Sequence, residues 1–214
     1  SAGDLVIKAK EVFNAHGDRP FFGRMLSTTN HVPFEFPEGR IELYEQPANT
    51  VNNAMKFADY AIGKFFELAQ KEEYFKNTIF VVVADHNTRV YGADLVPIHK
   101  FRIPGLIMGP GVKPQRYEKL ASQIDLLPTL LDLMGLETEH PMIGHNLLSL
   151  SEGEPGRAIM KYDLAQAFMV GDQVVVNRPN LEPQQFTYQN ARLIPTILDT
   201  EFARDALAHA QLPS

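Results

Sequence analysis

The stretch TIFVVVADHNTRVYG, residues 78–92, joins an uninterrupted apolar run to an abrupt polar end. Residues 79–84 are too few for a core helix, are rich in β-branched side chains and show no alternation, which predicts a strand buried on both faces of a parallel sheet. Ligands of such sheets bind beyond the carboxyl ends of the strands. Asp85 and His86 follow this strand directly, so they occupy the expected position of a functional site.

Asp85 and His86 are candidate metal ligands, because a carboxylate supplies charge and a hard oxygen while a neutral imidazole supplies a directional nitrogen lone pair. A simpler interpretation also fits the dipeptide: Asp85 caps the next turn and His86 packs under the loop. Successive side chains of a strand point to opposite faces, so both can reach one metal only if the backbone turns at Asp85. Asn87 and Thr88 are poor strand formers and favour that turn.

The composition excludes several classes of function. With 214 residues, 44% of them hydrophobic, the chain can bury a full core. A net charge of −6 without any cluster of Lys or Arg argues against a nucleic-acid partner, since phosphate neutralisation needs grouped cations. No apolar run approaches the roughly 20 residues that cross a bilayer, and no secretory signal is visible. The absence of cysteine excludes disulfides, zinc–thiolate sites and cysteine nucleophiles.

Helices and strands alternate around the central strand. Apolar spacing predicts helices at residues 4–16 and 49–71. Short apolar runs predict two further strands, at residues 21–26 and 103–108. A β-α-β crossover puts both strand ends on one side of a sheet. We therefore expect His31, just past one strand, to face the same crevice as Asp85 and His86.

The segment NTRVYGADLVPIHKFR, residues 87–102, is predicted to be an irregular loop whose length is typical of functional loops. Arg89 could clamp an anionic substrate, although a solvated charge is the commoner role of a loop arginine. His99 is a second candidate in this loop. In the helix predicted from SQIDLLPTLLDLMG, Asp125 is interpreted as the N-cap, and His145 beyond it as a structural residue near the site.

From Ala158 onward the apolar segments become short, and the segments AQAFMV and QVVVN joined by Gly171 and Asp172 predict a tight hairpin. The predicted fold class is α/β: a mostly parallel sheet with flanking helices, followed by a small C-terminal antiparallel meander and a helix. We divide the chain into residues 1–150 and a subdomain of residues 151–214 that packs on them.

Five stretches in this order carry a resemblance to a known family: FFGRMLSTTNHVPFEFP, FADYAIGKFFELA, NTIFVVVADH, IPGLIMGPG and SQIDLLPTLLDLMG. Together they resemble the sulfatase-type branch of the alkaline phosphatase superfamily, most closely the lipoteichoic acid synthase-like phosphoglycerol transferases. The resemblance spans about residues 21–148. It implies an alkaline phosphatase/sulfatase-like fold, in which residues 1–150 are the C-terminal part of the catalytic domain.

The resemblance also implies roles for single residues. Asp85 and His86 match the paired metal ligands of the central strand, and His31 matches the substrate-binding histidine. Arg89 and His99, singled out from their loop alone, are the further candidate substrate contacts. Mn²⁺ is the favoured metal, because a mixed carboxylate and imidazole shell suits it better than Ca²⁺. Mg²⁺, Ca²⁺ and Zn²⁺ are the alternatives. The nucleophile belongs to sequence expected before Ser1, so this chain alone is predicted to be inactive.

The implied activity is transfer of a phosphoglycerol group from a phospholipid headgroup donor to a glycan or glycolipid acceptor, on the extracytoplasmic face of a cell-envelope membrane. Sulfate-ester or phosphodiester hydrolysis is the alternative within the superfamily, and a non-catalytic binding module is the alternative outside it. The remaining expected partner is the N-terminal half of the same domain. In its absence we expect self-association, because uncovered strand edges recruit other chains.

Overall fold

The computed structural model describes residues 2–87 and 90–211. The chain forms two compact units, residues 1–80 and residues 81–214. The predicted division after residue 150 stays a prediction. Each unit has its own packing.

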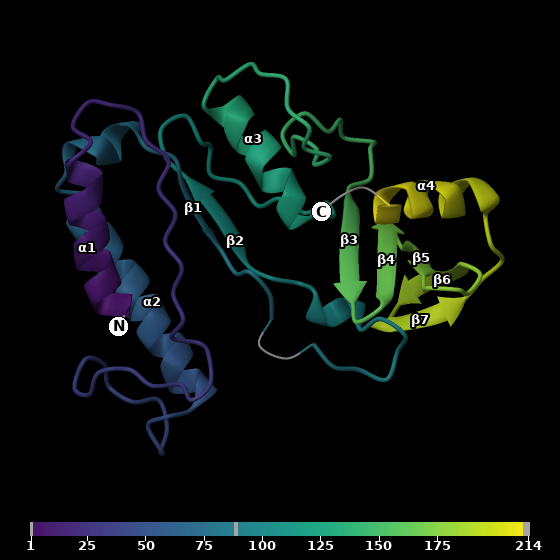
Figure 1. Ribbon diagram of the computed structural model, residues 1–214, viewed down its shortest axis with the longest axis horizontal. Helices are drawn as coiled ribbons and strands as arrows, with labels where there is room; N and C mark the ends of the chain where they lie inside the picture. The colour runs from purple at the N-terminus through teal and green to yellow at the C-terminus, as the bar shows by residue number, and fades with distance from the viewer. Residues whose placement is uncertain (1, 88–89, 212–214) are drawn as a thin grey trace. The chain divides into compact units, whose positions relative to one another are not determined.

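The first unit is built on two helices, α1 (Ala2–Asn14) and α2 (Val51–Ala69), followed by the short 3-10 helix η1 (Glu73–Asn77). Both long helices confirm the sequence prediction. α1 packs against α2 (Figure 1), and the buried residues of this contact are Val6, Ala9, Phe65 and Ala69. The spacing of these small and aromatic residues follows the helical period, so one face of each helix is buried.

The prediction of a strand at residues 21–26 is wrong, because this segment pairs with no strand among the described residues. The side chain of Phe21 packs on α1 and the residues that follow it instead. The ring of Phe21 stacks on Phe13 and on His16, with centroids 5.0 Å apart in both pairs. Gly23 also lies directly against the Phe13 ring. Aromatic packing therefore fixes the segment where the sequence pattern predicted backbone pairing.

The long segment between His31 and α2 is held by the start of that helix. Asn53 is fully buried, and its amide oxygen accepts from the backbone N–H of Tyr44 at 2.7 Å while its NH₂ group donates to the carbonyls of Glu45 and Ala48. Thr50 caps α2 by accepting from the Asn53 N–H at 3.2 Å. One residue of α2 thus orders a loop that has no secondary structure of its own.

The central strand, β1 (Phe80–Val83), forms a two-stranded sheet with β2 (Gly105–Met108). The amide of Ala84 donates to the carbonyl of Pro104 at 3.3 Å, so the end of β1 meets the start of β2 and this pair runs antiparallel. The prediction that β1 is buried on both faces is wrong for the described residues, because three of its residues are half-buried and Val83 is exposed. β1 pairs with β2 in this sheet. Val83 is exposed because no helix or second sheet among the described residues covers it.

Between and after these strands lie three short helices: η2 (Ile98–Lys100), η3 (Gln123–Asp125) and α3 (Leu126–Leu133). α3 confirms the predicted helix and is followed by Gly135, whose φ of 66° favours glycine. Asp125 is the N-cap residue of α3, as predicted, but its side chain does not cap that helix. Ser122 and Asp125 form a capping box around η3, so the Asp125 carboxylate accepts the Ser122 N–H and bonds no amide of α3.

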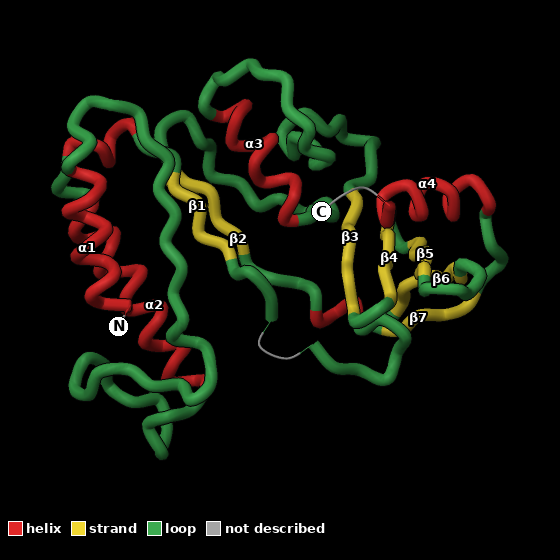
Figure 2. Tube along the Cα trace, in the orientation of Figure 1, coloured by secondary structure: helices red, strands yellow, loops and turns green. Residues whose placement is uncertain are grey.

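The C-terminal part is an antiparallel meander, which confirms the prediction. Its strands pair in chain order (Figures 1 and 2): β3 (Arg157–Tyr162), β4 (Ala165–Val170), β5 (Gln173–Asn177), β6 (Gln184–Gln189) and β7 (Arg192–Pro195). One face packs on Val96 and Ile98, and the other packs on α4 (Thr200–Gln211). The chain is therefore a mixed α/β protein with a C-terminal meander and helix, as predicted. The predicted mostly parallel sheet is not formed among the described residues, whose strand pairs are antiparallel.

Candidate functional site

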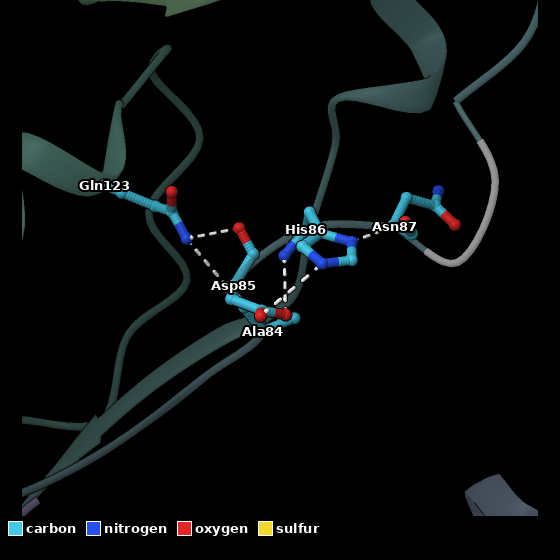
Figure 3. A network of polar contacts seen from close by, with 5 residues as sticks. All are labelled: Ala84, Asp85, His86, Asn87 and Gln123. Atoms are coloured by element: carbon cyan, nitrogen blue, oxygen red, sulfur yellow. Dashed lines mark hydrogen bonds and ion pairs between the residues drawn. The ribbon is translucent and has the colours of Figure 1, made fainter. Parts of the chain in front are cut away.

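Asp85 and His86 lie directly after β1, with their side chains on the same side of the backbone (Figure 3). Oδ2 of Asp85 is 3.5 Å from Nε2 of His86, and both side chains are 70% exposed. The predicted convergence of the two side chains is thus present. An oxygen and a nitrogen separated by this distance can both bind one cation, and the exposure leaves that position open to solvent.

The backbone turn at Asp85 produces this convergence. The backbone bends at Asp85 and His86, and Oδ1 of Asp85 accepts the N–H of His86 at 2.9 Å within this bend. Nδ1 of His86 lies 2.9 Å from the carbonyl oxygen of Asn87. Because a carbonyl only accepts, this contact requires the proton on Nδ1, which leaves the lone pair of a neutral ring on Nε2. The nitrogen that faces Asp85 is therefore the one suited to binding a metal.

Gln123 holds the same turn from η3 (Figure 3). Its side-chain Nε2 donates to the carbonyl of Ala84 at 2.9 Å and to the carbonyl of Asp85 at 2.8 Å. Sequence reasoning did not single out this residue. Gln123 lies 39 positions after Ala84 and 38 positions after Asp85 in the chain. The one sequence feature that could have indicated it is its place in the SQIDLLPTLLDLMG stretch.

Behind η3 lies a buried polar cluster built around Asp125, which is 2% exposed. Oδ1 of Asp125 accepts the N–H of His145 at 2.8 Å, so the predicted structural position of His145 holds through its backbone. The Arg157 guanidinium donates through Nε to the His145 ring at 3.2 Å and through Nη2 to the carbonyl of Ile143. Burial lowers the pKa of Arg157, and the Asp125 carboxylate opposes that shift.

The side chains at Asp85 and His86 provide only part of the coordination shell of a divalent metal. Asp85 and His86 supply one oxygen and one nitrogen, ligand types that Mn²⁺ and Zn²⁺ accept. Across residues 2–87 and 90–211, however, no group of three or more His, Cys, Asp or Glu side chains could hold a metal. The pair fits part of a coordination shell, and further ligands would have to come from elsewhere.

The other predicted site residues lie apart from this pair in the chain. His31 is exposed in a turn of the first unit, where its N–H donates to the carbonyl of Thr28 at 3.0 Å and its own carbonyl accepts the N–H of Phe34 at 2.8 Å. His99 is exposed on η2. Arg89 lies outside the described residues. The substrate-binding roles of all three stay predictions.

No helix in the described ranges is long and apolar enough to cross a membrane.

Comparisons with known proteins give a consistent family. The sequence model of the sulfatase family matches residues 1–136. Lipoteichoic acid synthase 2 of Bacillus subtilis is 28% identical over 159 residues, which are 64% of this chain and 24% of that protein. Lipoteichoic acid synthase of Staphylococcus saprophyticus is 28% identical over 172 residues, 68% of this chain and 26% of that protein. This chain thus spans about a quarter of the length of these relatives.

Solved structures agree with the sequence relatives. The crystal structure of an alkaline phosphatase superfamily protein from Vibrio parahaemolyticus is 38% identical with a TM-score of 0.87, covering 100% of this chain and 56% of that chain. The structure described as Ps i-CgsB is 18% identical with a TM-score of 0.67, covering 96% of this chain and 52% of that chain. The second likeness concerns the fold alone.

Proposed function

This chain belongs to the sulfatase family, and we propose that it contributes to a metal-dependent transfer of a phosphoglycerol group, or a related phospho-alcohol, from a lipid to an envelope glycan or glycolipid. The sequence resemblance to lipoteichoic acid synthase-like members of the alkaline phosphatase superfamily is confirmed. The superfamily is one of enzymes that generally use divalent metals. The specific reaction, donor and acceptor are our proposal.

The convergence of Asp85 and His86 is the observation that supports this proposal most directly. An exposed carboxylate oxygen and an imidazole nitrogen with its lone pair on the same side can hold a divalent ion, with Mn²⁺ favoured over Mg²⁺, Ca²⁺ and Zn²⁺. When bound, such an ion neutralises charge on phosphate oxygens and lowers the pKa of a nucleophile. Asp85 and His86 would bind and orient it, and the Nδ1 contact of His86 would keep the ring in the required tautomer.

We assign substrate binding to His31, Arg89 and His99. Histidine and arginine side chains are groups that donate hydrogen bonds to phosphate oxygens. Exposure of His31 and His99 leaves their rings accessible to a headgroup. The expected location of the reaction is the extracytoplasmic face of a cell-envelope membrane, where lipid donors and envelope glycans meet.

Residues 1–214 alone should show no turnover. The described residues contain no cluster of three metal-binding side chains, so Asp85 and His86 alone leave the coordination shell of the proposed metal incomplete. The two-stranded sheet of β1 and β2 also exposes Val83 and Leu106. We therefore propose that the N-terminal half of the domain covers this sheet, and that the isolated chain self-associates. Light scattering that gives a stable 24.1 kDa monomer at high concentration would contradict this part.

The activity is tested on the gene product that contains these residues. It is incubated with phosphatidylglycerol vesicles and Mn²⁺, and release of diacylglycerol is measured. His86→Ala should lower the rate by orders of magnitude, whereas His140→Ala, at an exposed position, should not. Diacylglycerol release that is equal in both variants would contradict the proposal. Release of sulfate from an aryl sulfate ester without release of diacylglycerol would favour the hydrolase alternative.

The predicted role of His31 has its own readout in the same assay. His31→Ala should lower the rate by orders of magnitude and leave the Mn²⁺ content close to wild type, because His31 is assigned to substrate. Loss of the metal from this variant would show that His31 is a ligand instead.

A further inference from the structure

We propose that Gln123 is a positioning residue that locks the turn on which Asp85 and His86 converge, an inference that rests on the proposed function of that pair. Gln123 touches neither side chain. Its Nε2 group donates to the carbonyls of two successive residues, Ala84 at 2.9 Å and Asp85 at 2.8 Å (Figure 3). The contact is therefore made to the backbone that carries the pair.

The geometry of successive carbonyls gives this contact its meaning. In an extended strand, successive carbonyls point to opposite sides of the chain, toward different neighbours. Both can face one nitrogen only where the backbone turns between them. The same turn places the side chains of Asp85 and His86 on one side, with Oδ2 and Nε2 3.5 Å apart. Gln123 can make both hydrogen bonds only when the backbone turn that carries the pair is formed.

Glutamine is well suited to this position. A side-chain NH₂ group offers two donors, so one residue can satisfy two carbonyls that lie beyond the β1–β2 ladder. A glutamate of the same shape has no donor when ionised and would repel both oxygens. An asparagine would keep the amide but would be one methylene shorter, so it could not span the same gap.

The backbone that carries Gln123 is itself fixed. The capping box between Ser122 and the buried Asp125 closes η3, with the Ser122 N–H 2.7 Å from Oδ2 of Asp125. The following loop packs directly on this helix. A Cβ on Gly144 would lie 1.9 Å from the carbonyl oxygen of Ile124, so only glycine fits there. Gln123 thus extends from a rigid turn, which lets it impose a geometry on residues 84–86.

Amide hydrogen exchange without metal tests the positioning role. The variant Gln123→Glu keeps the shape and removes both donors, and Gln115→Glu introduces the same charge at another exposed position. Exchange of the His86 N–H, which donates to Asp85 Oδ1, should become about tenfold faster in Gln123→Glu and stay unchanged in Gln115→Glu. Exchange of the Val174 N–H in β5 should be the same in all three proteins. Unchanged His86 exchange in Gln123→Glu would overturn the inference.

Gln123→Asn provides a second variant without a new charge. We expect exchange of the His86 N–H to accelerate by the same factor, because the shorter asparagine side chain cannot reach the carbonyls of Ala84 and Asp85. Exchange at the wild-type rate in this variant would contradict the inference.

A Mn²⁺ titration separates this inference from the proposed function. Residues that orient metal ligands typically change affinity by about tenfold or more, so Gln123→Glu should weaken Mn²⁺ binding by about tenfold. If exchange at His86 accelerates while the wild-type chain binds no Mn²⁺ at Asp85, the positioning role stands and the proposed function is contradicted. If Mn²⁺ binds at Asp85 equally well in both proteins, the positioning role is overturned.

Discussion

The two compact units of this chain are stabilised by different kinds of contact. In residues 1–80 aromatic rings dominate: the rings that pack on one another there include Phe13, Phe21, Phe65, Phe66, Tyr74, Phe75 and Phe80. In residues 81–214 an aliphatic sheet core stands beside a buried polar cluster around Asp125. Aromatic packing holds the helices of the first unit, where buried Asn53 orders one loop, whereas in the second unit polar contacts also hold the backbone near Asp85.

The largest expected effect is the loss of an aromatic side chain from the first unit. Phe57 is 1% exposed and stacks on Phe36 with centroids 5.1 Å apart. Phe57→Ala should lower the free energy of unfolding by about 3–5 kcal/mol, because it leaves a cavity under the loop that α2 holds. Phe22→Ala, at a position that is 80% exposed, should have little effect in the same denaturant titration. Equal effects of the two substitutions would contradict this account of the first unit.

The second unit should respond strongly to the loss of one buried carboxylate. Asp125→Ala removes the acceptor for the N–H groups of Ser122 and His145 and leaves the Arg157 charge less compensated. We expect a decrease of about 3 kcal/mol in the free energy of unfolding. Asp132→Ala, on the exposed side of α3, serves as the control and should change it by less than about 0.5 kcal/mol. A small effect of Asp125→Ala would mean that the polar cluster is not a stabilising element.

The same difference explains which features the sequence could predict. The helices α1 and α2 follow from apolar spacing, and the abrupt end of the apolar run after Ala84 predicted the turn on which Asp85 and His86 converge. Residues 21–26 were mispredicted as a strand because a short apolar run anchored by one ring, that of Phe21, has the same sequence pattern as a short strand.

The contacts of polar residues could not be predicted in this way. Gln123 reaches Asp85 across 38 positions, and no local pattern encodes such a distance. The burial of Asp125 is a second feature that could not be predicted. An acidic residue before a helix predicts an N-cap whether its side chain is exposed or buried. Apolar periodicity is a local signal, whereas a hydrogen bond between distant segments depends on the finished fold.

The smallest expected effect concerns the pH dependence of the first unit. Hydrogen bonds from Lys10 and Asn14 hold the pKa of Glu72 below its ordinary value of 4.5. A carboxyl whose pKa is lowered in the folded state contributes stability above its ordinary pKa and loses it as the pH falls through the folded value. Glu72→Gln should therefore melt slightly below wild type at pH 7, and the difference should fade below pH 4.5.

Glu73→Gln is the matched control for this experiment, because its carboxylate is 91% exposed in an ion pair with Lys76. Exposed pairs of this kind contribute little to stability. A difference between Glu72→Gln and wild type that persists unchanged at low pH would contradict a role for the ionised Glu72 carboxylate.

The central claim is that Asp85 and His86 together bind a divalent metal, and NMR with Mn²⁺ tests it most directly. Mn²⁺ is paramagnetic and broadens the resonances of nearby nuclei, so a titration of the ¹⁵N-labelled chain locates the ion. We predict broadening centred on residues 84–87 that disappears in Asp85→Asn and His86→Ala and persists in His140→Ala. Broadening that is spread over other acidic side chains and is unchanged by Asp85→Asn would contradict the claim.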